Sequence, residues 1–143
     1  MIKLIAVALA LSFAFGAKAQ QLDKLRAEDI YLVRGIGFTS KPCGATSATP
    51  EEQLEKNENH RTQIDVSKWL GYIQRAKSVR TGYDKWWATI TVSLSGERQI
   101  IFDGQGYFCL RTKDPKVFYY YQVAKRDYEE LYKSWNAIKA AEK

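Results

Sequence analysis

The two cysteines, Cys43 and Cys109, are the residues whose type and spacing point most directly to chemistry. An even number of cysteines in a small exported chain is typical of a disulfide. A bridge between them would close a loop of about 67 residues, which the chain-entropy model values at roughly 4 kcal/mol. The alternative is a Cys43 nucleophile with His60 as its base, but residues 41–44 do not suggest the groups that such catalysis needs. We therefore predict a Cys43–Cys109 disulfide.

Carboxylates in turns are the second group that could do chemistry, because a pair at a suitable separation hydrolyses glycosidic bonds. The candidates in or beside predicted turns are Asp84, Glu97, Asp103 and Asp114. Most turn carboxylates are solvated or bond their own backbone, so a glycosidase is the less favoured interpretation. His60 ends a charged segment, residues 51–61, and is expected to be solvated rather than catalytic. The sequence predicts no catalytic residue and no enzyme.

Metal and cofactor motifs are the third possibility. One histidine and two widely separated cysteines do not form the paired ligand motifs of zinc sites. Residues 103–106, Asp-Gly-Gln-Gly, lack the further acidic ligands of a calcium loop and are predicted to form a hairpin turn. Residues 35–37, Gly-Ile-Gly, lack the third glycine of a phosphate-binding loop. The sequence therefore predicts neither a metal nor a cofactor.

The aromatic residues indicate binding. Four tryptophans and nine tyrosines exceed what a core of this size requires. Trp87 and Tyr120 have the opposite strand parity from the predicted core residues Trp86 and Tyr121. Rigid rings beside cations are typical of protein-recognition hot spots, and they also stack on sugars. We predict Trp87, Tyr120 and Arg98 as binding residues; the alternative is that both sheet faces are covered and these rings fill a second small core.

The beginning of the chain predicts export from the cytoplasm. Lys3, an apolar stretch over residues 4–15 and small residues at 17–19 form a signal-peptide pattern, with cleavage before Gln20. The apolar stretch is shorter than a membrane span, so the mature chain is expected in the periplasm or outside the cell. Residues 20–143 then form one domain with a formal charge of +6 − 2 = +4. That charge favours acidic partners and is too mild for a nucleic-acid interface.

The first half of the mature chain is predicted to hold one strand and one helix. Residues 29–38 form a strand with Ile30 and Leu32 on the same face. Asp65 caps a helix that ends near Val79. Its apolar stripe consists of Val66, Trp69, Leu70, Ile73 and Ala76.

The second half is predicted to be a meander followed by a helix. Strands over residues 86–94, 98–102, 107–111 and 117–123 are joined by three short turns. A closing helix begins with a capping box of Asp127 and Glu130. Its apolar stripe consists of Tyr128, Leu131, Trp135 and Ile138.

These elements predict an α+β fold, in which an antiparallel meander sheet of four to five strands is covered on one face by the C-terminal helix and the mid-chain helix. The size, the export signal and the lack of catalytic motifs suit a small periplasmic binding protein. We expect an inhibitor or immunity-type protein that blocks an envelope-acting toxin or hydrolase by protein–protein binding. The alternatives are a glycan- or peptidoglycan-binding module and a small envelope hydrolase.

Overall fold

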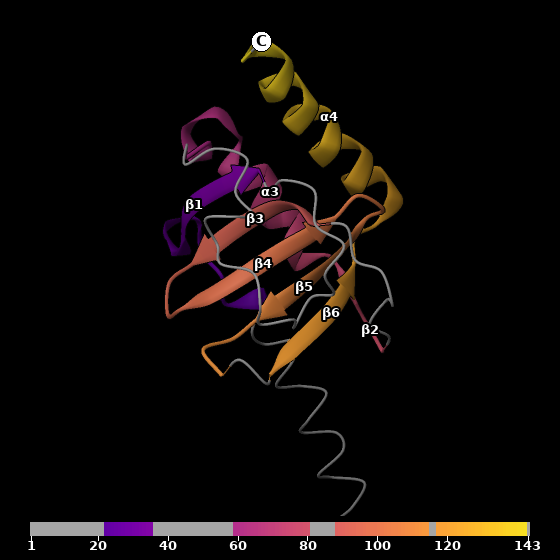
Figure 1. Ribbon diagram of the computed structural model, residues 1–143. Helices are drawn as coiled ribbons and strands as arrows, with labels where there is room; N and C mark the ends of the chain where they lie inside the picture. Colours follow the sequence, from indigo (N-terminus) through magenta and orange to yellow (C-terminus); the bar gives the residue numbers. More distant parts are fainter. Residues whose placement is uncertain (1–21, 36–58, 81–87, 115–116, 143) are drawn as a thin grey trace, which may run out of the picture.

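In a computed structural model, the described residues are 22–35, 59–80, 88–114 and 117–142, and they form an α+β fold (Figure 1). The predicted leader, Cys43, Trp86 and Trp87 lie outside these residues. The described part of the chain contains one antiparallel sheet of six strands in the order β1-β3-β4-β5-β6-β2. The sheet therefore has slightly more strands than the four to five that the sequence predicts.

The predicted meander is confirmed as the centre of this sheet. Its four strands pair consecutively through antiparallel hairpins: β3 (Ala88–Leu94), β4 (Arg98–Asp103), β5 (Tyr107–Arg111) and β6 (Phe118–Gln122). Strand β1 (Ile30–Gly35) pairs with β3, and the short strand β2 (Lys77–Val79) pairs with β6. These two strands form the edges of the sheet.

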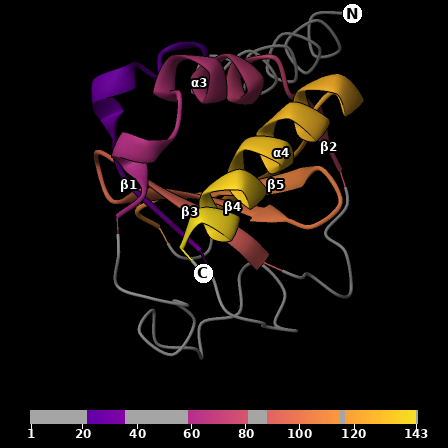
Figure 2. The same ribbon diagram turned by 90° about the horizontal axis from the view of Figure 1, so that it is seen from above.

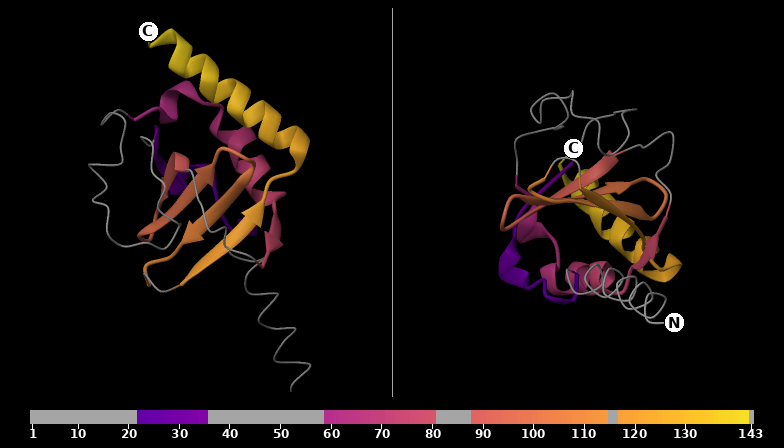
Figure 3. Two further views of the ribbon diagram at one scale, coloured as in Figure 1. Left: turned by 45° about the vertical axis from the view of Figure 1, so that its right-hand side comes forward. Right: turned by 90° about the horizontal axis from the view of Figure 1, so that it is seen from below.

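Two α-helices, α3 (Val66–Gln74) and α4 (Lys125–Ala141), lie on the same face of the sheet (Figures 2 and 3). Two short 3-10 helices, η1 (Ala27–Asp29) and η2 (Arg61–Gln63), flank β1 and α3. This arrangement confirms that the mid-chain helix and the C-terminal helix cover one face. We call the opposite side of the sheet the far face.

The core lies between the sheet and the helices. The predicted alternation of β3 is confirmed, because Ile90, Val92 and Leu94 are fully buried on the helix-covered face. Trp69 of α3 contacts Phe102 of β4, with ring centroids 6.4 Å apart, and Trp135 of α4 at 6.3 Å. These three rings hold both helices against the sheet.

Strand β1 departs from the predicted alternation. A β-bulge between Ile30 and Leu32 shifts its register against β3. Because side chains alternate with a period of two, one extra residue inverts the face of everything that follows. Val33 is therefore fully buried on the helix side, and Leu32 pairs with Ser93 of the far face. The prediction that Ile30 and Leu32 share a face was wrong.

Helix α3 is shorter than predicted. Asp65 caps it as expected, since its carboxylate accepts a hydrogen bond from the Lys68 backbone N–H at 3.1 Å. The helix ends at Gln74 rather than near Val79, because Lys77–Val79 pair with β6 as an edge strand. Pairing with a distant strand thus outweighs the local helical pattern.

Helix α4 begins differently from the predicted capping box. Its N-cap is Ala124, without a side-chain cap, so Asp127 lies within the first turn. The Asp127 carboxylate instead accepts two hydrogen bonds from the Arg75 guanidinium, at 3.0 and 3.1 Å. A long-range ion pair between the two helices therefore replaces the predicted cap. The predicted apolar stripe is confirmed, with Leu131 and Trp135 buried.

Candidate functional site

The far face carries a small apolar cluster at its centre. Cys109 is fully buried there, and Ile101, Tyr107 and Tyr120 pack around it. Tyr120 thus lies on the opposite face from the buried Tyr121, as predicted. Its side chain is half-buried, and this burial raises the pKa of its hydroxyl. This position leaves Tyr120 less surface for a partner than the sequence suggests.

Cys109 is the described half of the predicted disulfide. None of the cysteines in the described part of the chain is free. Cys43 lies outside the described residues. The pairing of Cys109 with Cys43 therefore stays a prediction.

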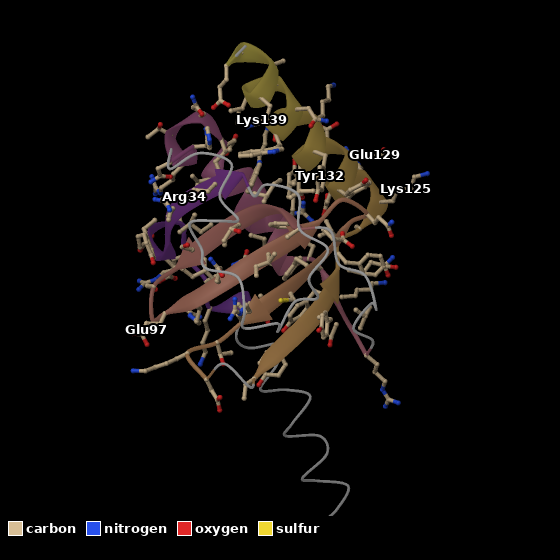
Figure 4. All side chains as sticks on the ribbon, viewed as in Figure 1. Arg34, Glu97, Lys125, Glu129, Tyr132 and Lys139 are labelled. Atoms are coloured by element: carbon tan, nitrogen blue, oxygen red, sulfur yellow. The ribbon has the colours of Figure 1, made fainter. Side chains whose placement is uncertain are left out.

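Beside this cluster, an open hollow of about 310 Å³ lies where β3 turns into β4 and β5 ends. We call it the basic basin, and Figure 4 labels Glu97 at the turn that borders it. Its floor includes a row of paired residues, in which Gln99 lies between Ser93 and Arg111. The full lining is Tyr31, Ser93, Glu97, Arg98, Gln99, Arg111, Thr112 and Lys113.

The β3–β4 turn shapes one wall of the basic basin. Gly96 and Glu97 both adopt left-handed backbone conformations, with φ of 74° and 56°. Such a conformation costs a residue with a side chain about 1–2 kcal/mol. Glu97 is the one non-glycine residue with positive φ in the described part of the chain. Arg98, a predicted binding residue, lines the basin, and its Nε donates to the Ser95 carbonyl at 2.9 Å.

Tyr31 is the aromatic residue of the basic basin, and the sequence did not single it out. Its side chain is 56% exposed, the one large hydrophobic side chain exposed in the described part of the chain. It directly follows the buried Ile30 in β1, so it faces away from the core. Its backbone is held, because the Asn59 side chain donates to the Tyr31 carbonyl at 3.0 Å and accepts from the Val33 N–H at 3.1 Å. Strand alternation with Ile30 inward already directs Tyr31 away from the core, but nothing local in the sequence shows that its ring lies beside Arg98 and Arg111.

The basic basin has an excess of positive charge, with three cations against one carboxylate. Lys113 Nζ lies 3.5 Å from Glu97 Oε2, but the two side chains are 81% and 71% exposed. Such exposed pairs contribute about 0–1 kcal/mol. Within the described residues, the Arg111 guanidinium has neither an ion pair nor a hydrogen bond. The basin therefore suits an anionic group with little competition from the protein itself.

The candidate carboxylates Glu97 and Asp103 are not a pair. They lie six positions apart along β4, a span of roughly 20 Å at about 3.3 Å per residue. The carboxyl groups of glycosidases lie about 5–10 Å apart. Asp103 is buried, accepts from the backbone N–H groups of Gln105 and Tyr107 at 2.9 Å, and has a pKa that burial raises. Asp103 therefore stabilises the predicted turn at residues 103–106. The other candidate, Asp84, lies outside the described residues.

His60 is buried, with only 3% of its surface exposed, so the prediction that it is solvated was wrong. Its Nδ1 lies 2.6 Å from Gln63 Oε1 and 3.1 Å from Glu142 Oε1. The Trp135 ring contacts it edge-on, with centroids 5.2 Å apart. His60 also donates its backbone N–H to the Val33 carbonyl at 2.8 Å. These contacts attach the C-terminal end of α4 to β1, and His60 lines neither of the hollows described here.

A second hollow, of about 470 Å³, lies between α3 and the first turns of α4. Its lining is Lys68, Tyr72, Arg75, Arg126, Asp127 and Glu130. Its most buried charge, Asp127, already binds Arg75, and this hydrogen bonding raises the pKa of Arg75. The hollow is therefore a weaker candidate for a charged ligand than the basic basin.

Among the described residues, no group of three or more histidine, cysteine, aspartate or glutamate side chains is placed to hold a metal ion. No helix within the same residues has the length and apolar character needed to cross a membrane. Comparison of the chain with protein-family models, curated proteins and solved structures finds no match in any of the three.

Proposed function

We propose that this protein is a small exported binding protein that acts as an inhibitor or immunity-type protein in the cell envelope. In this proposal, residues 1–19 direct export, and the basic basin binds an envelope-acting toxin or hydrolase. The protein then blocks its partner by contact and performs no catalysis. The observation that carries the proposal is the exposed ring of Tyr31 in the same hollow as the unpaired guanidinium of Arg111.

Residue type and rigidity both support this assignment. Tyrosine and arginine are enriched among the residues that contribute most to protein–protein binding. Tyr31 lies on β1, which pairs with β3, and Arg111 lies on β5, which pairs with β4. Their backbone is already ordered, so binding costs little conformational entropy there. The formal charge of +4 for residues 20–143 favours a partner with an acidic surface.

A glycan- or peptidoglycan-binding module is the second candidate. The exposed ring of Tyr31 favours it, because aromatic faces also stack on sugar rings. The charged lining of the basic basin favours the protein partner, because a neutral sugar offers no carboxylate to the unpaired Arg111 guanidinium. A direct comparison of the two ligand classes separates these candidates.

The test uses the purified protein as immobilised bait for envelope extracts. Wild type is compared with a Tyr31→Ala variant and with a Lys125→Gln control, because Lys125 lies on α4 and pairs with Glu129 away from the basic basin. We expect wild type and the control to retain the same enzyme or toxin, and the Tyr31→Ala variant to retain several-fold less. Soluble wild type should then abolish the activity of the captured protein at one equivalent.

Other results would contradict the proposal. Retention of isolated peptidoglycan, with no captured protein inhibited, would favour the glycan-binding alternative. Turnover of peptidoglycan by the purified protein itself, lost in a single carboxylate variant, would show an enzyme. Equal capture by wild type and Tyr31→Ala would place the binding surface elsewhere.

A further inference from the structure

The shape of the basic basin restricts what it can bind. The basic basin is a hollow, so it can receive a group that protrudes from a partner. It cannot itself fill the active-site cleft of an acidic enzyme, because that would need a protruding element on this protein. The basin is open and about 310 Å³ in volume, which accommodates one or two side chains and not a folded segment. A partner that uses this surface must therefore insert side chains from a loop or turn.

The charges of the basic basin indicate the chemistry of those side chains. Its one carboxylate, Glu97, lies 3.5 Å from Lys113 across an exposed and easily broken contact. Arg111 offers a planar fork of donors that matches a carboxylate, and no described residue occupies it. Lys113 thus already pairs with an intramolecular carboxylate, whereas Arg111 is left for an incoming one.

We propose that the basic basin is a carboxylate-binding site in which the partner's acidic side chain pairs with Arg111 and competes with Glu97 for Lys113. A glutamate or aspartate on a protruding loop of the partner enters the basin, displaces Glu97 from Lys113 and pairs with Arg111. The Tyr31 ring packs against the residue beside it. This inference rests on the proposed function, and it identifies an acidic loop, away from any active-site cleft, as the feature that the protein recognises.

The test measures binding of poly-L-glutamate to the purified protein by calorimetry at low salt. Arg111→Gln should weaken binding about fivefold or more, since it removes the charged fork. Glu97→Gln should tighten binding by about two- to fivefold, because it removes the competing carboxylate. Lys125→Gln, the matched control on α4, should leave the affinity within twofold of wild type. Binding should weaken between about 50 and 200 mM salt, where screening increases.

The opposite signs expected for Arg111→Gln and Glu97→Gln separate a specific site from general attraction to a positive protein. Equal effects of Arg111→Gln and Lys125→Gln, or weaker binding by Glu97→Gln, would overturn the inference. Absence of poly-L-glutamate binding to wild type would overturn it too, while a captured and inhibited enzyme would leave the proposed function standing. Preference for heparin over poly-L-glutamate, with the same dependence on Arg111, would assign the basin to anionic glycans and overturn the protein-loop assignment.

Discussion

Replacing Trp135 by alanine tests whether α4 is held on the sheet as described. Trp135 is 5% exposed and contacts Trp69 at 6.3 Å and the His60 ring at 5.2 Å. Removal of a buried tryptophan side chain costs about 3–5 kcal/mol, from lost transfer free energy and the cavity left behind. For a domain of this size, each kcal/mol lowers the melting temperature by about 3–5 °C, so we expect a fall of roughly 10–20 °C.

The assay is urea unfolding followed by far-ultraviolet circular dichroism, because the substitution removes a fluorescent probe. The midpoint should fall while the denaturant slope stays constant, which indicates a change in stability rather than in the unfolded state. Asn136→Ala, at the next and exposed position of α4, is the matched control and should stay within about 0.5 kcal/mol of wild type. A loss below about 1 kcal/mol for Trp135→Ala would refute the docking of α4 through this ring.

Three further predictions concern charge and cross-linking. Burial raises the pKa of Asp103 above its usual 3.8, so its stabilising contribution is full below that pH and is lost as the pH rises through the folded-state pKa. Unfolding measured from about pH 3.5 to 6 should show the stability of wild type falling relative to Asp103→Asn. Arg75→Ala should lower the free energy of unfolding by roughly 1–3 kcal/mol in urea titrations, because it leaves the buried Asp127 carboxylate unpaired. Mass spectrometry after alkylation should detect no free thiol, and Cys109→Ser should lower the melting temperature by removing the predicted bridge to Cys43.

The sequence predicted the elements whose signals are local. Alternation from Ala88 to Leu94 and the turns at residues 95–97 and 103–106 were sufficient to find the meander and its buried face. Asp65 was recognised as a helix cap because its bond to the Lys68 N–H spans three residues. The strands, turns and helix cap depend on residues that are close together in the chain, so the sequence alone is enough to predict them.

The errors involve contacts between distant parts of the chain. The bulge in β1 depends on pairing with β3, and without it Leu32 and Val33 were assigned to the wrong faces of the sheet. His60 is buried because Trp135 and Glu142 of the C-terminal region reach it. Of the predicted binding residues, Arg98 lines the basin, Tyr120 packs beside Cys109, and Trp87 lies outside the described residues.

The most direct test of the central claim is the affinity of the purified protein for its captured envelope partner, measured by calorimetry. The comparison includes wild type, Tyr31→Ala, and Tyr31→Phe, which keeps the ring and removes only the hydroxyl. If the basic basin is the binding surface, Tyr31→Ala should raise the dissociation constant by more than about fivefold, as loss of a hot-spot ring does. Tyr31→Phe should stay closer to wild type. An unchanged dissociation constant for a folded Tyr31→Ala protein would contradict the account.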